Sequence, residues 1–237
     1  MDAGPSIAER AYASIRANLL AGIYRPGERL DAAIVAREHG ASITPIREAM
    51  NKLAGERLLE MQTHQGFKVP LLTEGELRAL YDWTCQQLIA GLRLAPKTRL
   101  ARVEDGLWPS AAMFERDMIA ATERVCLGIA QLSGNTRCYL AIEQANAELR
   151  LVRRFEPLMI APGSEDLRGF AWSLARSGLD GAETMLEDYH RARRDVAADI
   201  AGLLTMAAHH GFPPGGMDEV ESSGVVLAFA EPDEVAT

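Results

Sequence analysis

Apolar and polar positions follow helical spacing at the start of this chain and strand spacing soon after it. From residue 7 to residue 20 the apolar side chains form one stripe, and Gly22 follows as a stop, which predicts a helix. The stripe consists of Ile7, Ala11, Ile15 and Leu19. Pro26 and Gly27 then break the chain, after which Asp31 can cap a short second helix and Gly40 can end it in the left-handed conformation.

A third helix is predicted to begin at Ser42, which can cap it. Pro45 is tolerated in its first turn because the backbone N–H groups there have no helical partner. Helical spacing assigns its inward face to Ile46, Ala49, Met50 and Leu53. Residues 58–70 then alternate, with a polar interruption that ends at Gly66, which predicts two strands joined by a loop. The alternating apolar residues are Leu59, Met61, Phe67 and Val69. Three helices followed by a hairpin predict a winged helix-turn-helix.

Beyond Pro70 the pattern changes to long helical segments with few strand signals. Breaks at proline and glycine predict helices over 74–95, 109–133, 136–156, 164–177 and 180–209. The predicted fold is therefore mainly α, with a winged helix-turn-helix followed by an antiparallel all-helical bundle. We expect domains over residues 1–72 and 73–211, and a loosely ordered acidic tail over 212–237.

The side of the third helix opposite its apolar face carries side chains suited to reading DNA. Residues at the start of such a helix reach base edges in the major groove, where arginine reads guanine and asparagine reads adenine. Thr44 and the helix N-terminus suit phosphate oxygens. The candidates on this helix are Ser42, Ile43, Thr44, Arg47, Asn51 and Lys52. In the loop of the hairpin, His64, Gln65, Gly66 and Lys68 are candidates for the backbone or the minor groove.

Charge is distributed unevenly along the chain. Residues 1–70 carry nine Lys and Arg against eight Asp and Glu, whereas the whole chain has a net charge of −8. A protein with a negative overall field depends on a local patch for DNA affinity, and a dimer would double the contacts. We therefore expect a homodimer and a strong dependence of binding on salt.

The location of the protein and the state of its cysteines follow from simpler signals. The amino terminus has no basic segment followed by an apolar core, and no apolar run approaches the ~18 residues of a membrane helix, so we expect a cytoplasmic protein. Cys85, Cys126 and Cys138 are an odd number without metal-site spacing, which predicts buried free thiols.

The segment from Tyr24 to Val69 resembles the GntR family of bacterial transcription regulators. The resemblance is carried by Pro26-Gly27-Glu28-Arg29-Leu30, by Ser42-Ile43-Thr44-Pro45-Ile46-Arg47-Glu48-Ala49-Met50 and by Gly66-Phe67-Lys68-Val69. Many members have arginine where this chain has Ile43, which could contact a thymine methyl group instead. The order of a winged helix and a bundle resembles the FadR-type subgroup with its FCD-like domain. That resemblance implies a dimeric regulator, a repressor rather than an activator, whose bundle binds a small effector.

The subgroup resemblance also implies a metal held by one Asp and three His in many bundles, and this chain lacks most of that set. Counting from Gly134-Asn135 places Thr122 and Cys126 at two of the positions and Leu167 at or near a third, so that only His190 matches. We expect no metal and no other cofactor. The candidate effector residues are Thr122, Cys126, Arg150, Arg154 and His190.

Alternatives remain for the bundle. Its arginine clusters, at Arg150, Arg153 and Arg154 and at Arg191, Arg193 and Arg194, could hold an anion or could pair with acidic side chains. The acidic neighbours available are Glu148, Glu156, Glu187, Asp188 and Asp195. His190 could equally be a packed or hydrogen-bonded core residue. The bundle could serve only dimerisation or a partner protein. An enzyme is disfavoured, since no nucleophile with a base and no spaced carboxylate pair is found.

Overall fold

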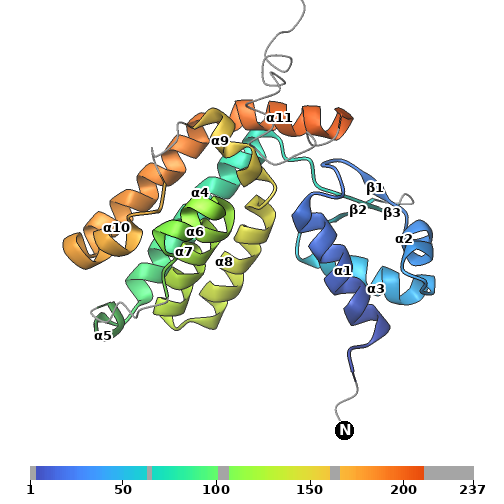
Figure 1. The fold of residues 1–237 in the computed structure, drawn as a ribbon, viewed down its shortest axis with the longest axis horizontal. Coiled ribbons are helices and arrows are strands. Elements are labelled where there is room, and N and C mark those ends of the chain that lie inside the picture. Colours follow the sequence, from blue (N-terminus) through green and yellow to red (C-terminus); the bar gives the residue numbers. More distant parts are fainter. Residues whose placement is uncertain (1–3, 63–65, 101–106, 161–165, 211–237) are drawn as a thin grey trace, which may run out of the picture.

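The computed structural model describes residues 4–62, 66–100, 107–160 and 166–210. They form a small amino-terminal part with three helices and three strands, here called the head (residues 4–69), and a helical bundle (residues 74–210). Figure 1 shows the two side by side, with α3 and α2 of the head reaching away from the bundle. The proposed tail, residues 212–237, lies outside the described residues.

The helices of the head begin and end where the sequence places their signals. They are α1 (Ile7–Ala21), α2 (Ala32–Glu38) and α3 (Ile43–Gly55). The Asp31 side chain accepts from Ala33 N, and Gly40 has a φ of 58°, as expected for its two predicted roles. Ser42 occupies the N-cap position of α3, but its side chain makes no capping hydrogen bond. The prediction that the Ser42 side chain caps α3 is therefore wrong.

The core of the head forms where α1 packs against α3. Ile15, Ile46, Met50 and Leu53 are fully buried, and Ala49 is nearly so. Ile7, predicted to share the α1 stripe, is 52% exposed because it lies in the first turn, beyond the end of this core. The inward face predicted for α3 is confirmed, so the opposite face of α3 is free to meet a partner.

The strands of the head form an antiparallel sheet in the order β1-β3-β2. They are β1 (Arg29–Leu30), β2 (Glu60–Gln62) and β3 (Gly66–Lys68). The sequence predicted β2 and β3 but not β1, which has only two residues. Met61 lies opposite Phe67 in the register, yet Met61 is 69% exposed and Phe67 only 7%, because β2 is an outer strand beyond the reach of the core.

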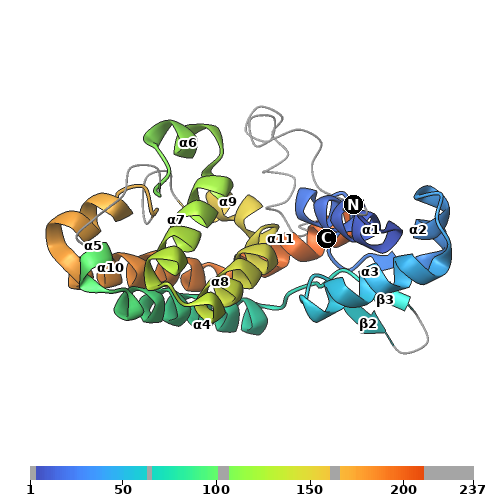
Figure 2. The same ribbon diagram turned by 90° about the horizontal axis from the view of Figure 1, so that it is seen from below.

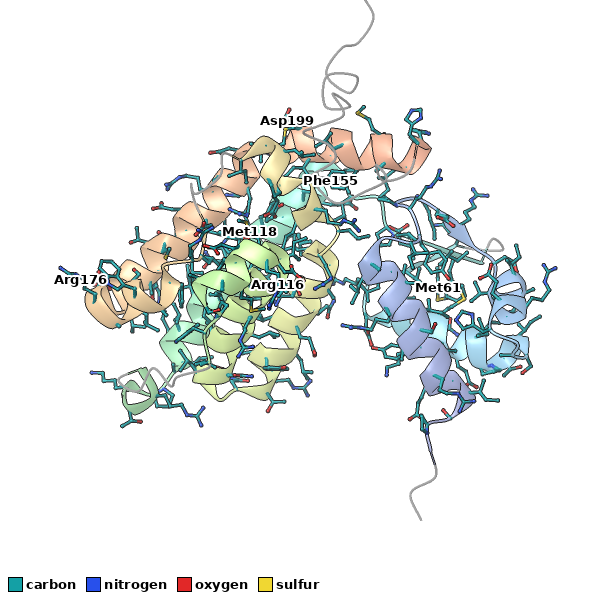
Figure 3. The ribbon with its side chains drawn as sticks, in the orientation of Figure 1. Met61, Arg116, Met118, Phe155, Arg176 and Asp199 are labelled. Carbon is teal, nitrogen blue, oxygen red and sulfur yellow. The ribbon has the colours of Figure 1, made fainter. Side chains whose placement is uncertain are left out.

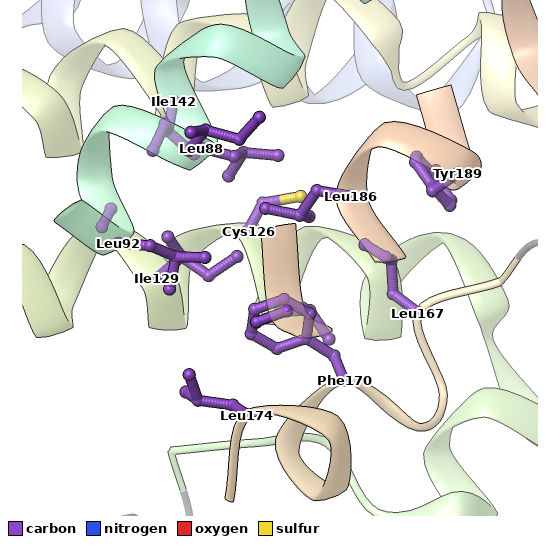
Figure 4. Close-up of a cluster of buried hydrophobic side chains, with 14 of the residues drawn as sticks. Leu88, Leu92, Cys126, Ile129, Ile142, Leu167, Phe170, Leu174, Leu186 and Tyr189 are labelled. Atoms are coloured by element: carbon purple, nitrogen blue, oxygen red, sulfur yellow. The ribbon is translucent and has the colours of Figure 1, made fainter. Parts of the chain in front are cut away.

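The bundle is arranged around one long helix, α4 (Glu74–Leu94), against which α7, α8, α10 and α11 pack. The other helices are α5 (Lys97–Leu100), α6 (Ala111–Arg116), α7 (Met118–Ser133), α8 (Thr136–Leu149), α9 (Glu156–Met159), α10 (Phe170–Asp195) and α11 (Ala197–His210), with a 3-10 turn, η1 (Val152–Arg154), between α8 and α9. Their shared core contains Leu88, Ile129, Phe170 and Leu186 (Figure 4). No described helix combines the length and apolar character needed to cross a membrane.

Several predicted helices of the bundle are divided in the structure. The span 109–133 breaks at Asp117, whose φ of −153° is not helical and whose side chain caps α7. The span 136–156 ends as a regular helix at Leu149, and the span 180–209 is divided at Val196. The break predicted at Gly178 is a non-helical residue inside α10, with φ 67°. The sequence did not predict α5. Helical periodicity continues across a break as short as Asp117 or Val196, so the pattern of apolar residues did not reveal these two divisions.

All three cysteines are free thiols, but they differ in burial. Cys85 and Cys126 are buried and Cys138 is only partly so, which corrects the prediction for Cys138. Burial raises the pKa of the Cys126 thiol to about 11, so it stays protonated near neutral pH.

A buried carboxylate joins three elements of the bundle. Glu156 on α9 accepts from the Tyr81 hydroxyl of α4 at 2.9 Å and from Arg193 Nε of α10 at 2.8 Å. The Glu156 and Arg193 side chains are each only 6% exposed. Removing one member of such a pair strongly destabilises the folded protein, because the remaining charge is left buried without its partner.

We predict that Arg193→Met lowers the free energy of unfolding by about 3–5 kcal/mol, because Glu156 loses its cationic partner. Arg191 is the matched control, since it pairs with Asp188 at the surface with 57% of its side chain exposed. Arg191→Met should cost no more than about 1 kcal/mol. Urea unfolding followed by circular dichroism measures both, and equal losses in the two variants would contradict the prediction.

Candidate nucleic-acid interface

The first half of α3 presents an exposed strip of polar side chains. Ser42, Thr44, Arg47 and Asn51 are all exposed, and Ile43 is 43% exposed at the start of the helix. Ile43, Arg47 and Asn51 are spaced four apart, so they follow one side of the helix. Among the described residues, neither Arg47 nor Asn51 has a hydrogen bond or ion pair within the chain. Both side chains are therefore available to base edges.

The structure adds Glu48 to this surface, which the sequence reasoning missed. Glu48 is exposed and lies four residues after Thr44, in the middle of the outward face. Its carboxylate can only accept hydrogen bonds when ionised, and the major-groove donor that it suits is the N4 amino group of cytosine. The signal was available in the sequence, because Glu48 sits between the two inward residues Ile46 and Ala49 at a helical position that cannot be buried with them.

Lys52 lies differently from the other candidates on α3. Its Nζ is 3.8 Å from the centre of the Tyr12 ring of α1, and the Tyr12 hydroxyl donates to Glu56 at 2.8 Å. Burial, together with this hydrogen bond, raises the pKa of Tyr12 to about 12, so the ring remains neutral beneath the ammonium group. Lys52 is thus placed at the α1 side of the surface, away from the line of Ile43, Arg47 and Asn51.

The hairpin places Gly66 at the start of β3, where its φ is 81°. A Cβ atom there would lie 3.1 Å from the Leu30 carbonyl oxygen, so glycine suits both the backbone conformation and the close approach of β1. Lys68 is half-buried on the same strand. The candidates His64 and Gln65 lie outside the described residues.

The candidate effector residues divide into two groups. Thr122, Cys126 and His190 are buried inside the bundle, whereas Arg150 and Arg154 are only half-buried at its periphery. Arg150 pairs with Glu123 of α7, and Arg154 Nη1 donates to the Ala21 carbonyl of the head at 2.7 Å. The structure therefore does not bring these five residues together in one site.

Arg153, rather than its neighbours, points into the bundle. It is 3% exposed, donates to the Asn146 side chain at 3.0 Å and lies 3.6 Å from Glu123. The helical pattern of the sequence carried no signal for this, because α8 ends at Leu149 and Arg153 lies in η1 beyond it. Arg153 Nε and Glu123 Oε1 are buried without a hydrogen-bond partner among the described residues.

The residues present do not fit the metal site of the subgroup. Among the described residues, no three His, Cys, Asp or Glu side chains are placed to hold a metal ion. Leu167 is fully buried at the position where a histidine would be needed, and the Cys126 thiol is held protonated. One histidine and one thiol leave too few ligands for such a site, so we assign no metal-dependent step to this chain.

Comparison with known proteins agrees with the geometry of the head. Residues 7–69 match the family described as bacterial regulatory proteins, gntR family. The head is therefore similar in sequence to that family over almost its whole length. The HTH-type transcriptional repressor GlaR of Escherichia coli (strain K12) is 27% identical over 71 residues, which cover 30% of this chain and 32% of that protein. The HTH-type regulator YdhC of Bacillus subtilis (strain 168) is 33% identical over 70 residues, covering 30% and 31%.

The chain thus matches about a third of the length of these two relatives. A solved structure from Rhodococcus sp. RHA1, assigned as a transcriptional regulator GntR, extends the likeness of fold to the bundle. It has a TM-score of 0.60 and 20% sequence identity, and the match covers 84% of this chain and 99% of that one. The fold of this chain, head and bundle together, is therefore similar to that of the Rhodococcus protein.

The titration of His190 tests whether water reaches the interior of the bundle. Its Nδ1 is 2.7 Å from the Leu186 carbonyl, and burial lowers its pKa to about 3. The folded protein therefore binds fewer protons than the unfolded chain below pH 6.5, and stability falls as the pH falls from there towards 3.

We predict that lowering the pH from 7.5 to 5 removes about 2 kcal/mol of unfolding free energy through His190. His190→Asn keeps an N–H donor for Leu186 at the position of Nδ1 and removes the titration, so this variant should lose correspondingly less over the same interval. Urea unfolding of both proteins at the two pH values makes the comparison. An identical loss would show that His190 is hydrated enough to titrate normally in the folded state.

Proposed function

We propose that this chain is a DNA-binding transcription regulator that reads a short inverted repeat as a homodimer and acts as a repressor. The observation that carries the proposal is the exposed strip on α3 of the gntR-family domain, where Arg47 and Asn51 have no partner within the described residues. Two relatives of this domain are named as a transcriptional repressor and a transcriptional regulator, which supports the same function here. We propose no enzymatic activity.

Each side chain of the strip suits one partner on the DNA. The Arg47 guanidinium can donate twice to the O6 and N7 atoms of guanine, and the Asn51 amide can pair with N6 and N7 of adenine. Ile43 offers only apolar contact, which suits a thymine methyl group. Ser42 and Thr44 lie at the N-terminus of α3, a helix of 13 residues, where a phosphate oxygen is favoured by the backbone N–H groups. The Ser42 hydroxyl, which caps nothing, is available for that contact.

Dimerisation follows from the charge of the chain. A net charge of −8 opposes non-specific attraction to DNA, so a single head with a balanced charge is a weak binder. Two heads on one duplex add their contacts. An inverted repeat mirrors the two-fold symmetry of such a dimer.

Regulation by a small anionic effector belongs to the same proposal. The bundle would hold the anion near Arg153, whose Nε is buried without a partner. A second candidate is a regulator without an effector, whose bundle serves dimerisation or a partner protein. The pairing of the buried arginines favours this second candidate, because Arg153 already contacts Asn146 and Glu123, and Arg193 already contacts Glu156.

The proposal predicts that selection from random duplex DNA enriches a short inverted repeat with guanine and adenine in each half-site. Arg47→Ala should weaken binding to that repeat by about 1–3 kcal/mol per half-site and relax the preference for guanine. Arg176→Ala, on the far helix α10, is the matched control and should select the same sequence as the unchanged protein. Survival of the guanine preference in Arg47→Ala would show that α3 does not read DNA as proposed.

The two candidates for the bundle predict different thermal shifts on a panel of carboxylic and sugar acids. An effector present at about 100 times its dissociation constant should stabilise the folded chain by about 2.7 kcal/mol, seen as a rise in Tm. The same compound should change the affinity for the selected repeat. A panel without any shift would favour the regulator that has no small-molecule effector.

A further inference from the structure

A partly enclosed hollow lies where the bundle meets the head. It has a volume of about 60 Å³, and most of its wall is apolar. The head contributes side chains of α1 and of the loops beside the sheet, and the bundle contributes side chains of η1 and α11; among them are Leu19, Leu20, Leu58, Val69, Val152 and Leu204. Figures 1 and 2 both show α11 extending from the bundle towards the head. Neither part of the chain forms this hollow alone.

Two charged side chains, those of Arg57 and Glu148, also line the hollow. Together with Pro70 and Leu72 they line a larger groove between the head and α4, so the hollow and the groove adjoin at these residues. Met61, labelled in Figure 3, lies on the head side of the groove. The two charges therefore stand at the mouth of an apolar hollow, where a small molecule would enter from the groove.

The opposite charges at the mouth do not pair with each other. Among the described residues, the Arg57 side chain has no hydrogen bond or ion pair, and Glu148 has one hydrogen bond, from Gln144 Nε2 at 2.9 Å. Glu148 is half-buried on α8, and burial raises the pKa of its carboxyl while the charge of Arg57 acts in the opposite direction. The two groups thus attract each other across a gap that neither closes.

Arg57 is held in a backbone conformation that arginine rarely adopts. Its φ is 58°, and no other non-glycine residue in the described part of the chain has a positive φ. At the end of α3, Arg57 N donates to the Ala54 carbonyl and Leu58 N donates to the Leu53 carbonyl. This is the Schellman arrangement, in which glycine is favoured at the position of Arg57 because it has no Cβ. An exposed arginine without a polar partner in the described chain has nothing there to offset this strain, which indicates a function for its side chain.

We propose that the hollow binds an aliphatic α-amino acid of about the size of leucine. Its side chain enters the hollow, its carboxylate pairs with Arg57 and its ammonium group pairs with Glu148. An α-amino acid carries both charges on one carbon atom, so it suits an acid and a base that line one site without meeting. A simple acid or a simple amine would satisfy only one of them.

The size and the lining of the hollow select the side chain. A cavity of ~150 Å³ is needed to hold benzene, so the hollow is too small for an aromatic ring and suits about three or four carbon atoms. Its walls are methyl and methylene groups of leucine and valine, which favour an apolar occupant by the hydrophobic effect. A polar side chain would lose its water there without gaining a hydrogen bond.

A bound amino acid would touch both parts of the chain at once. On the head it would contact α1 and the loop after α3, and on the bundle it would contact η1 and α11. It would therefore favour one position of the head relative to the bundle. Binding can be measured without DNA, so it stands or falls independently of the reading of DNA by Arg47. Only a resulting change in DNA affinity rests on the proposed function.

The test is calorimetric titration of the full chain with L-leucine, which should bind once per chain. Glu148→Gln and Arg57→Gly should each weaken binding by at least about tenfold, because each removes one charged partner of the ligand. Glu143→Gln is the matched control, since Glu143 is exposed on the same helix as Glu148 but does not line the hollow, and this variant should bind leucine as the unchanged protein does. Glycine relieves the strain at position 57, so Arg57→Gly should remain folded, which circular dichroism checks.

Two analogues of leucine test the two charges separately. Isocaproate has the carbon skeleton of leucine without the ammonium group, and isoamylamine has its side chain and ammonium group without the carboxylate. Both should bind the unchanged protein at least about tenfold more weakly than L-leucine. Equal binding of either analogue would overturn the proposal, because the protein would then not recognise both charges of the amino acid.

A change in the size of the hollow tests where the side chain lies. L-phenylalanine should bind the unchanged protein at least about tenfold more weakly than L-leucine, because its ring does not fit. Leu20→Ala enlarges the hollow at a half-buried position and should reduce or reverse this preference. The proposal is overturned if the unchanged protein binds no leucine, if Glu148→Gln and Arg57→Gly bind it as tightly as the unchanged protein, or if Leu20→Ala leaves the preference unaltered.

Discussion

The buried carboxylate of Glu156 is the interaction on which the arrangement of the bundle depends. It accepts hydrogen bonds from Tyr81 of α4 and Arg193 of α10, so one side chain joins three elements that are far apart in the sequence. The Arg193 guanidinium also lies 3.3 Å from the centre of the Tyr189 ring, which covers it. A charge in a dry interior is tolerated only when its partners are complete, and this requirement fixes the relative positions of the helices more narrowly than apolar packing does.

The short segment around Glu156 also connects the bundle to the head. Within it, Arg150 pairs with Glu123 of α7, Arg153 reaches Asn146 of α8, and Arg154 donates to the Ala21 carbonyl at the end of α1. One short segment thus contacts the bundle interior, the bundle surface and the head. Helix α8 ends at Leu149, and Arg153 and Arg154 both lie in the 3-10 turn η1 that follows it.

The head and the bundle place their polar side chains in different ways. The head buries one side of α3, so the other side can carry exposed polar residues such as Arg47 and Asn51. In the bundle, by contrast, buried polar side chains are packed, paired or held uncharged, as His190, Arg153 and Cys126 show. On the surface of the bundle, the outer side of α4 leaves Trp83 and Leu94 exposed, and α10 leaves Trp172 exposed.

The sequence by itself determined the three helices and the hairpin of the head, because each is marked by a local signal, whereas β1, with only two residues, carried none. Helical spacing fixed the inward face of α3, and therefore Arg47 and Asn51 as its outward residues, while Asp31 and Gly40 marked the ends of α2. In the bundle, local patterns could not determine which polar side chains are buried or which residues they contact. Which of Arg150, Arg153 and Arg154 is buried depends on where the helix ends, and the partners of Arg153 and Arg193 come from other helices. Such contacts are decided by tertiary structure, because desolvating a charge is favourable only where distant residues supply its hydrogen bonds.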